Sequence, residues 1–453
     1  MSLYKSLQQR EAANRPIRIG VIGAGTFGSM FLAQARRTPG MKLVGIAELD
    51  LAKATQTCQE IGWSKEAIGY ENSAGAINDS ANKGKIILTD NSEELIKADL
   101  DVIVESTGVV EAGTYHAWTA IEYGKHIVMV NIEADALLGP VLNKRAREKG
   151  LVYSMAYGDQ PAIIDEMIDW ARTIGVEVVC AGKGTRYQPK YHYSTPETVW
   201  NYFGFTEEQL STGKFNAQMY NSFLDGTKST IEMCALANAS GLVPQKKGLK
   251  FPPVGVQNLA NMLKPVNDGG ILEHSGTVEV VASEQRDGSP IKDHLRWGVF
   301  VVFQVTTDHM RRFLSTHDFV KDTSGEYAAA FRPYHLIGLE LGISVAKVAL
   351  RGEETGSANF FTADVASVAK KDLKKGDVLD GEGGYTVYGR LVRAGDSITG
   401  SYLPMGLSRG AKLLQPMRKD SILTYQDVEL DRCQLSYKIR KILEDDFKPI
   451  INN

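Results

Sequence analysis

The sequence has few cysteines, no long apolar run and almost no excess charge, and each absence excludes a class of protein. Its four cysteines (Cys58, Cys180, Cys234 and Cys433) lie far apart and form no CxxC pair, which argues against a zinc site and a disulfide framework and fits a reducing compartment. No apolar run approaches the ~20 residues of a membrane span. The net charge of -3 gives no electrostatic reason to expect a nucleic acid or an anionic membrane as partner.

The start of the chain also lacks the apolar stretch of a signal peptide. The segment MSLYKSLQQREAANRP is polar throughout, so we expect a cytoplasmic protein. What the chain does have is the composition of a globular enzyme, with 43% hydrophobic and 23% charged residues. Its 453 residues are too many for one compact core, so we expect two or three domains.

Short apolar runs alternate with amphipathic stretches over the first third of the chain. Six of these runs are typical of buried strands: 17–23, 42–47, 85–90, 101–107, 126–131 and 151–157. Alternation of strand and helix of this kind produces a parallel sheet covered on both faces. We therefore predict an α/β fold in which residues 1–157 form a Rossmann domain with a doubly wound parallel sheet.

The pattern changes after this first third. Pro161 opens a predicted helix that Gly175 closes, and it begins an α+β domain over 158–355 that we expect to carry catalysis and oligomerisation. Residues 277–283 and 297–306 are expected as antiparallel strands of an exposed sheet. Such a sheet pairs with another subunit, which would give a homodimer or a larger symmetric oligomer.

Two further elements complete the predicted architecture. The apolar stretch 333–352 predicts a long helix, which we expect to pack back on the Rossmann domain. Short strands and many glycines over 356–453 predict a small all-β domain followed by a C-terminal tail.

A glycine-rich motif, GAGTFG (23–28), directly follows the first predicted strand and opens a helix. Its GxGxxG spacing suits a nucleotide loop, because the first glycine permits the tight turn, the second lets the backbone approach a pyrophosphate, and the third allows close packing of helix on strand. The helix N-terminus adds free N–H groups and a partial positive charge. The motif predicts binding of NAD or NADP at Gly23, Gly25, Thr26, Phe27 and Gly28.

An acidic residue, Glu48, comes 20 positions after Gly28 at the end of the second predicted strand. A carboxylate there can accept hydrogen bonds from the ribose 2′-OH, which favours NAD. Asp50 is a second candidate for this role and equally a helix N-cap. Lys53 is close enough to bind a 2′-phosphate, so the sequence leaves the choice between NAD and NADP open.

Polar residues also follow the later strands. Ligands of open α/β sheets bind outside the carboxyl ends of the strands. We therefore expect the nicotinamide side of the site to be lined by Ser106, Thr107, Gly108, Asn131 and Glu133. Each of these residues is equally well explained as part of a loop or a helix cap.

Residues 225–241 predict a helix whose first turn carries a lysine. Asp225 is a good N-cap, and Asp225, Lys228 and Glu232 then share one helical face. A cation is electrostatically misplaced at a helix N-terminus, so Lys228 should give up its proton readily. Such a lysine can protonate the oxygen that gains charge as hydride reaches a carbonyl, with Asp225 orienting it. The alternative is a plain N-capped helix with a solvated lysine.

Other charged residues supply candidates for binding the substrate and a metal. A cationic group after a predicted strand can hold a phosphate or a carboxylate; it consists of Lys183, Arg186, Lys190 and His192. Arg332 and His335 open the predicted helix 333–352, where His335 can bond a substrate or lie satisfied in a core. Four carboxylates are enough to bind Mg²⁺ or Mn²⁺, although no spacing dictates that they do so: Glu133, Asp135, Asp159 and Glu232.

Several segments together resemble the homoserine-dehydrogenase-like oxidoreductases. GKHIVMVN (124–131) resembles the strand of that family beside the nicotinamide, and YGDQP (157–161) resembles its loop into the substrate domain. KGTRYQ (183–188) is similar to its substrate strand, and DGTKSTIEMCALANASG (225–241) to its helix with the catalytic Asp and Lys. The family carries a lysine after the asparagine, whereas this chain has Ile132, which argues against homoserine as the substrate.

Longer stretches resemble a subgroup of that family with an appended SAF domain, the 1-deoxy-D-xylulose 5-phosphate reductoisomerase-like enzymes. These stretches are FNAQMYNSFLDGTKST (215–230) and RPYHLIGLELGIS (332–344), and KKDLKKGDVL (370–379) resembles the SAF signature. Together with the residue pattern, the resemblance assigns catalysis to Lys228, Asp225, Glu232 and Lys183. It assigns substrate binding to Arg186, Lys190, Asp159, Thr227, Arg332 and His335.

The resemblance implies oxidation or reduction of a small, phosphorylated hydroxy-carbonyl compound with NAD or NADP. It also implies a preceding ketol rearrangement, which would need a divalent cation such as Mg²⁺ or Mn²⁺, and a place in isoprenoid biosynthesis. One alternative is a simple hydroxy-acid or amino-alcohol dehydrogenase without isomerisation or metal. An alternative of another class is an NAD(P)-binding sensor whose SAF domain carries the output, but such a protein needs no acid/base pair.

Overall fold

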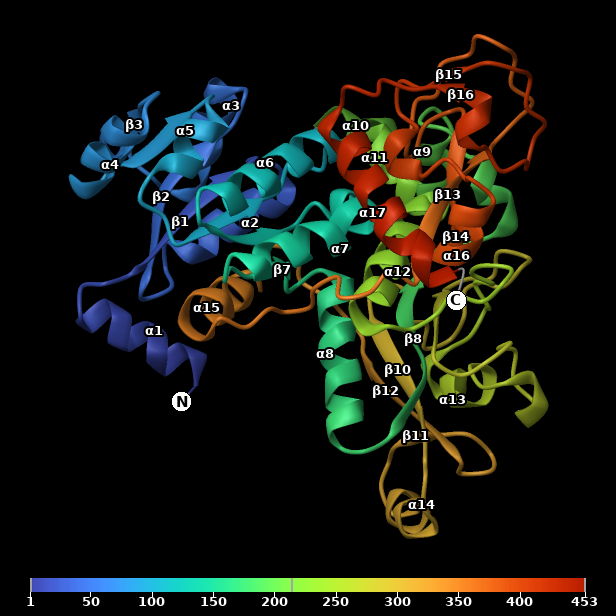
Figure 1. The fold of residues 1–453 in the computed structure, drawn as a ribbon. Coiled ribbons are helices and arrows are strands. Elements are labelled where there is room, and N and C mark those ends of the chain that lie inside the picture. Colours follow the sequence, from blue (N-terminus) through green and yellow to red (C-terminus); the bar gives the residue numbers. More distant parts are fainter. Residues whose placement is uncertain (1, 213–214, 452–453) are drawn as a thin grey trace. The chain divides into compact units, whose positions relative to one another are not determined.

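The computed structural model of the protein describes residues 2–212 and 215–451, and these form two compact units (Figure 1). Unit 1 comprises the residues up to Ile163 together with Leu336–Asn359. Unit 2 comprises Ile164–His335 together with the residues from Phe360 onward. Met1 and residues 452–453, the ends of the predicted terminal domains, lie outside the described residues.

Unit 1 is built on a sheet of seven parallel strands in the order β3-β4-β2-β1-β5-β6-β7. The predicted Rossmann-type sheet is confirmed, and each of the six apolar runs forms a strand. The short β3 was not predicted, because three residues carry too little pattern. The strands are β1 (Ile17–Ile22), β2 (Met41–Ala47), β3 (Ile68–Tyr70), β4 (Ile86–Thr89), β5 (Val102–Glu105), β6 (His126–Met129) and β7 (Tyr153–Met155).

Helices of unit 1 connect and cover these strands (Figure 1). They are α1 (Leu3–Ala12), α2 (Thr26–Ala35), α3 (Leu51–Ile61), α4 (Ala74–Asn82), α5 (Ser92–Lys97), α6 (Val110–Glu122), α7 (Ile132–Glu148) and α15 (Gly342–Arg351). Leu341 and Val345 at the start of α15 join the core beside the side chains of β1 and α2. The predicted helix over 333–352 is wrong in its first half, because Pro333 and the left-handed Gly338 (φ +70°) keep the chain in turns until Gly342.

Unit 2 contains a five-stranded sheet in the order β11-β12-β10-β8-β9. Its strands are β8 (Glu177–Thr185), β9 (Thr277–Ala282), β10 (Val299–Gln304), β11 (Val320–Lys321) and β12 (Tyr327–Arg332). The prediction of antiparallel strands holds for β10, whereas β9 is parallel to β8 because a long crossover returns the chain to the same end of the sheet.

The prediction that strands 277–283 and 297–306 form an exposed sheet is also wrong. Every residue of β9 is buried, and every residue of β10 except Gln304 is buried. Val299, Val301 and Val302 are fully covered. Alternation of exposed and buried side chains, which an open face would require, is absent from β9 and β10, so these strands present no free surface to another subunit.

The remaining elements of unit 2 surround this sheet. Its helices are α8 (Gln160–Thr173, which carries the boundary between the units), α9 (Val199–Phe203), α10 (Glu207–Thr212), α11 (Ala217–Leu224), α12 (Thr227–Ser240), α13 (Leu259–Met262), α14 (Asp308–Ser315), α16 (Ala394–Thr399) and α17 (Leu435–Ile451). Two antiparallel strand pairs belong to the C-terminal part: β13 (Ala363–Ala369) with β14 (Val387–Arg393), and β15 (Lys412–Leu413) with β16 (Val428–Glu429).

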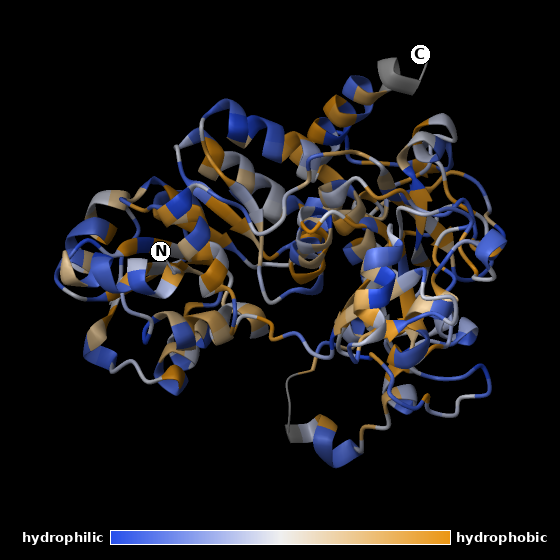
Figure 2. Cartoon of the chain, turned by 90° about the horizontal axis from the view of Figure 1, so that it is seen from below, coloured by the Kyte–Doolittle hydropathy of each residue, from blue (hydrophilic) through white to orange (hydrophobic). Residues whose placement is uncertain are grey.

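The C-terminal part carries helices in addition to the predicted strands. In α17 the buried Arg440 forms ion pairs with Asp364 of β13 at 2.5 Å and with Glu444 at 2.9 Å. Figure 2 shows hydrophobic residues gathered on the strands inside each unit, while the ribbon of α17 alternates between hydrophilic and hydrophobic residues. Among the described residues, no helix is long and apolar enough to cross a membrane.

Candidate active site

The glycine-rich loop lies at the end of β1, where that strand pairs with β2 on one side and with β5 on the other. This is the switch point at which open α/β sheets bind nucleotides. Gly23 adopts a left-handed φ of +92°, and a Cβ there would lie 2.9 Å from the carbonyl group of Ser106. The Ser106 hydroxyl in turn donates to Gly23 O at 2.8 Å. Ser106 therefore holds the turn of the glycine-rich loop, and its place beside the nicotinamide stays a prediction.

The other two glycines of the loop have opposite surroundings. A Cβ on Gly28 would lie 2.5 Å from Gly23 O, so only glycine allows α2 to approach the strand so closely. A Cβ on Gly25 would meet nothing within 4 Å. Gly25 and Thr26 are exposed at the N-terminus of α2, and Phe27 is half-buried beside them. This open, donor-rich start of a helix fits a pyrophosphate.

Glu48 lies beside the same loop at the end of β2. Its Oε2 accepts a hydrogen bond from the Ala24 N–H at 2.9 Å, and its Oε1 accepts from the Leu49 N–H at 2.9 Å. Asp50 Oδ1 accepts the Lys53 N–H at 2.9 Å and caps α3, which is the second of the two roles considered for it. Glu48 is therefore the carboxylate that borders the nucleotide loop.

At the end of β5 a buried carboxylate organises the next loop. Glu105, with no exposed surface, lies 3.2 Å from His116 Nδ1 and accepts a 2.5 Å hydrogen bond from the Thr107 hydroxyl. Thr107 and the left-handed Gly108 (φ +68°) follow it toward α6. The sequence pattern contained no indication of this Glu105–His116 contact, because the two residues lie on different elements.

Asn131 and Glu133 lie after β6, as predicted. Asn131 is buried and caps α7: its Oδ1 accepts the Ala134 N–H at 3.1 Å, and its amide donates to Val109 O at 3.0 Å. Glu133 is half-buried in the first turn of α7. Asp135 in the same turn accepts a hydrogen bond from the Tyr153 hydroxyl at 2.8 Å. Burial raises the pKa of Asp135 to about 7.

In unit 2 the candidate catalytic lysine begins the helix α12. Of the 14 residues of α12, all of them described, only Lys228 is not buried. Its N-cap is Gly226 with φ +84°, so the prediction that Asp225 caps the helix is wrong by one residue. The left-handed turn needs a glycine, and this requirement places the helix start after Gly226. Lys228 therefore emerges, half-buried, from the first turn of an otherwise enclosed helix.

Lys183 of β8 and Glu232 of α12 form a buried ion pair. The two residues are only 4% and 3% exposed, and Lys183 Nζ donates to Glu232 Oε2. Glu232 lies four residues after Lys228, so both side chains lie on one face of α12. Two of the four predicted catalytic residues, Lys183 and Glu232, are thus in direct contact, and Lys228 shares the helix face of Glu232.

Asp225, the fourth, belongs to a different set of contacts. Its carboxylate has no exposed surface and lies 2.7 Å from Lys370 Nζ. Its Oδ1 accepts the Thr227 N–H at 2.9 Å, while its carbonyl oxygen lies 2.7 Å from His192 Nδ1. These contacts hold the turn before the helix, and the predicted role of Asp225 in orienting Lys228 stays a prediction. Lys370 was missed because the run KKDLKK resembles a solvated stretch.

The residues predicted to bind substrate are dispersed over several elements. Arg186, just after β8, forms a 2.6 Å ion pair with Glu284, which also accepts a hydrogen bond from the Tyr191 hydroxyl at 3.0 Å. Lys190 is exposed beside Tyr191. Burial lowers the pKa of His192, which disfavours the cationic form expected from the sequence, and its Nε2 lies 2.8 Å from the Tyr187 hydroxyl.

The other substrate candidates have varied surroundings. The Thr227 hydroxyl is buried and accepts the Gly389 N–H at 2.9 Å. The guanidinium of Arg332, at the end of β12, lies 4.4 Å from the ring centroid of Tyr334. His335 Nδ1 lies 2.7 Å from Trp297 O in a loop rather than in a helix. Asp159 of unit 1 accepts the Gln160 N–H at 2.9 Å.

The carboxylates considered as metal ligands do not form a metal site in this structure. Asp135 is bonded to Tyr153 and Glu232 is paired with Lys183. Within the described ranges, no three His, Cys, Asp or Glu side chains come together as a ligand set. Glu232 is engaged by the ammonium of Lys183 and Asp135 by Tyr153, so these described carboxylates do not fit a resident metal and no chemical step is assigned to one.

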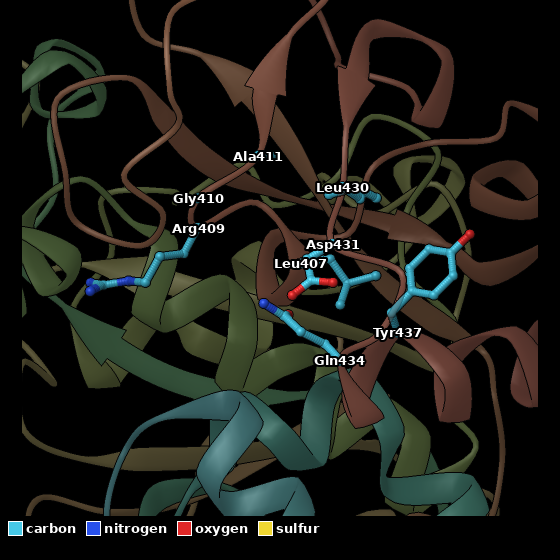
Figure 3. A pocket seen from close by; sticks show the side chains of 8 residues that line it. All are labelled: Leu407, Arg409, Gly410, Ala411, Leu430, Asp431, Gln434 and Tyr437. Atoms are coloured by element: carbon cyan, nitrogen blue, oxygen red, sulfur yellow. The ribbon is translucent and has the colours of Figure 1, made fainter.

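A small hollow in the C-terminal part of unit 2 is separate from these residues (Figure 3). It is lined by Leu407, Arg409, Gly410, Ala411, Leu430, Asp431, Gln434 and Tyr437. In Figure 3 the side chains of Arg409 and Tyr437 point away from Asp431. None of the lining residues is a candidate for cofactor binding or catalysis, so the hollow has no part in the candidate active site.

Protein families match both parts of this geometry. A family model described as "Oxidoreductase family, NAD-binding Rossmann fold" matches residues 17–129, which contain the glycine-rich loop and Glu48. A model described as "Oxidoreductase DRL, catalytic domain" matches residues 158–341, which contain Lys183, Lys228 and Glu232. Both matched families are oxidoreductases, so the chain carries an NAD-binding Rossmann domain and a domain similar to an oxidoreductase catalytic domain. No curated protein matches this oxidoreductase.

Solved structures similar to this oxidoreductase are distant. The 1-deoxy-D-xylulose 5-phosphate reductoisomerase from Zymomonas mobilis, solved in complex with NADPH, is 14% identical over 49% of this chain and 57% of that chain, with a TM-score of 0.34. A putative oxidoreductase, yvaA, from Bacillus subtilis is 13% identical over 74% of this chain and 89% of that chain, with a TM-score of 0.36. The apo scyllo-inositol dehydrogenase from Lactobacillus casei is 14% identical over 38% of this chain and 46% of that chain, with a TM-score of 0.26. This chain thus spans about half the length of the reductoisomerase and of the inositol dehydrogenase.

Proposed function

We propose that this oxidoreductase reduces the carbonyl group of a small, phosphorylated hydroxy-carbonyl compound, with Lys228 as the acid. The observation that carries the proposal is the partial exposure of Lys228 alone on the otherwise buried helix α12. The buried Lys183–Glu232 pair lies on the same helix and the neighbouring strand. A positioned lysine of this kind supplies the proton that a carbonyl reduction requires.

The proposed step transfers a hydride and a proton to the carbonyl group of the substrate. Bound NAD(P)H supplies a hydride to the carbonyl carbon. As that bond forms, the carbonyl oxygen takes a proton from Lys228 Nζ, and the lysine regains its proton from solvent. The Lys183–Glu232 pair places an ammonium and a carboxylate on the face of α12 that carries Lys228.

Cationic side chains support an anionic substrate. Arg186 and Lys190 follow β8, the strand that carries Lys183, and Arg332 ends β12. Guanidinium groups bind phosphate in a bidentate manner and lysines bind it as point charges. Arg186 is paired with Glu284, so binding a phosphate there would require the guanidinium to exchange one anionic partner for another.

A reductoisomerase of the 1-deoxy-D-xylulose 5-phosphate type is the finer form of this proposal, and it rests on the sequence resemblance. A simple dehydrogenase is the second candidate, and a specific contact favours it. Glu232 is engaged by Lys183, so a cation that polarises two adjacent substrate oxygens has no ready ligand there. The two candidates differ in their product, because only the first changes the carbon skeleton.

For the cofactor we propose NAD over NADP, because Glu48 borders the nucleotide loop and repels a 2′-phosphate.

We also propose a homo-oligomer in the cytoplasm. The location is supported by the scattered free cysteines. The assembly is supported by α14, which has no buried residue although it carries Phe313, 58% exposed. Sedimentation of a 49.6 kDa monomer at micromolar concentration would count against the oligomer.

The experiment that tests the proposed function is a screen of cofactor oxidation. The purified protein is mixed with NADH or NADPH and a panel of sugar phosphates, hydroxy-ketones and the corresponding unphosphorylated compounds, with and without Mg²⁺. We expect turnover with a phosphorylated hydroxy-carbonyl compound and much less with its unphosphorylated analogue. Analysis of the product skeleton separates rearrangement from simple reduction. Cofactor binding without turnover of any carbonyl would contradict the proposal.

A further inference from the structure

Lys370 is a buried lysine of the C-terminal part whose charge is completely satisfied. It directly follows β13 and is 4% exposed. Its Nζ lies 2.7 Å from Asp225 Oδ2 and donates to Ser194 O at 2.9 Å and to Gly384 O at 2.7 Å. The ion pair with Asp225 and the two carbonyl acceptors together compensate the charge of the ammonium group. Lys370 is therefore the positive partner of the buried Asp225 carboxylate.

Asp225 connects this charge to the start of α12. Its Oδ1 accepts the N–H of Thr227, the first residue of the helix. The Thr227 hydroxyl accepts the N–H of Gly389 in β14 at 2.9 Å. The left-handed Gly226 completes a turn over residues 225–227 that is held from the C-terminal part on two sides. Lys228 is the next residue along the chain.

We propose that Lys370 is a positioning residue for the reaction, which fixes the turn 225–227 and through it the side chain of Lys228. The inference rests on the proposed function, in which Lys228 is the acid. Lys370 lies outside residues 158–341, the range of the catalytic family model. It belongs instead to the segment that resembles the SAF signature, so the C-terminal part contributes to the geometry of the reaction.

The physical reason is the cost of an unpaired buried charge. Without the ammonium, the Asp225 carboxylate must take up a proton or move toward water. Either change weakens its hold on the Thr227 N–H and shifts the first turn of α12. A displacement of about 1 Å in a catalytic group costs on the order of 10²-fold in rate.

The test compares four variants of the full-length protein, Lys370→Met, Asp225→Asn, their double variant and Lys371→Met, by steady-state kinetics and cofactor titration. For Lys370→Met we expect kcat to fall about 10²-fold, with the dissociation constant for the cofactor unchanged, because the nucleotide loop belongs to unit 1. Lys371→Met, which removes the exposed neighbouring lysine, is the matched control and should turn over normally. The double variant Asp225→Asn/Lys370→Met should regain at least about tenfold in kcat over Lys370→Met, because no unpaired carboxylate remains.

If Lys370→Met does not fold, we expect the double variant to fold and to turn over substrate, because no unpaired buried carboxylate remains. An unfolded or inactive double variant would then overturn the inference. Near-normal turnover of Lys370→Met would overturn the inference. A double variant whose loss equals the product of the two single losses would overturn it as well, because the two residues would then act independently. Near-normal turnover of Lys228→Met would instead overturn the proposed function, so the two failures are distinguishable.

Discussion

Single residues account for two properties that can be measured directly, pH-dependent stability and cofactor choice. The first concerns Asp135, which is fully buried and whose pKa burial raises to about 7. The folded protein holds this proton more tightly than the unfolded chain, in which an aspartate has a pKa of about 3.9. The contribution of Asp135 to stability is therefore complete below pH ~4 and is lost as the pH rises toward 7.

We predict that Asp135→Asn gains stability relative to the wild type as the pH rises from about 4 to 7. The expected change in relative unfolding free energy is about 2–4 kcal/mol, at ~1.4 kcal/mol for each unit of pKa shift. Urea unfolding at pH 4.5 and at pH 8 measures it. Asp79→Asn, which alters an exposed aspartate of α4, is the control and should show no such trend. A stability difference that is independent of pH would contradict the assignment.

Glu48 determines cofactor choice in this account. Glu48→Gln keeps an oxygen that can accept the Ala24 N–H but removes the negative charge beside the ribose. We expect the ratio of NADPH to NADH affinity to rise, by about tenfold for 1.4 kcal/mol of removed repulsion. Fluorescence titration with both cofactors measures the ratio. Asp50→Asn keeps the cap of α3 and should leave the ratio nearly unchanged; a larger change in this variant would move the ribose role to Asp50.

At the scale of elements, two substitutions in the loop between β1 and α2 should affect different properties, one cofactor binding and the other stability. The space at Gly25 is open, whereas the space at Gly28 is filled by Gly23 O. We predict that Gly25→Val keeps the melting temperature within about 2 °C but abolishes cofactor binding, since its side chain fills the approach of the pyrophosphate. Gly28→Val should lower the melting temperature markedly, because the helix must move off the strand. Undiminished NADH and NADPH binding by Gly25→Val would contradict the nucleotide site.

Elements with a strong local pattern were predictable from the sequence. The strands β1, β2 and β4 to β7 follow from apolar runs, and α12 follows from its composition and its closing Gly241. Short β3 carries too little pattern, and the direction of β9 depends on the route of a crossover rather than on its own residues. The start of α15 differs from the prediction because Gly338 in a left-handed conformation outweighs the apolar character of its neighbours.

At the scale of the whole molecule, the candidate site was predictable where motifs are local and unpredictable where partners are distant in sequence. The glycine-rich loop and Lys228 belong to contiguous motifs. The Lys183–Glu232 pair joins residues 49 positions apart, and the contact of Lys370 with Asp225 spans 145 positions. Such contacts exist only once the sheet of unit 2 and the β13–β14 pair have brought α12 between them. Burial distinguishes Lys370 from the exposed lysines that follow it in its run, and this contact is the basis of its proposed positioning role.

The measurement that tests the central claim most directly is single-turnover hydride transfer by Lys228→Met, followed as loss of NAD(P)H absorbance with the substrate found by the screen. The substitution keeps most of the side-chain volume and removes the proton donor. We predict a rate lower by about 10²–10⁴-fold and an unchanged cofactor affinity. Lys228→Arg should restore little activity, because a guanidinium does not release its proton. The control Lys247→Met, which removes an exposed lysine, should react at the normal rate. Hydride transfer at the wild-type rate in Lys228→Met would contradict the account.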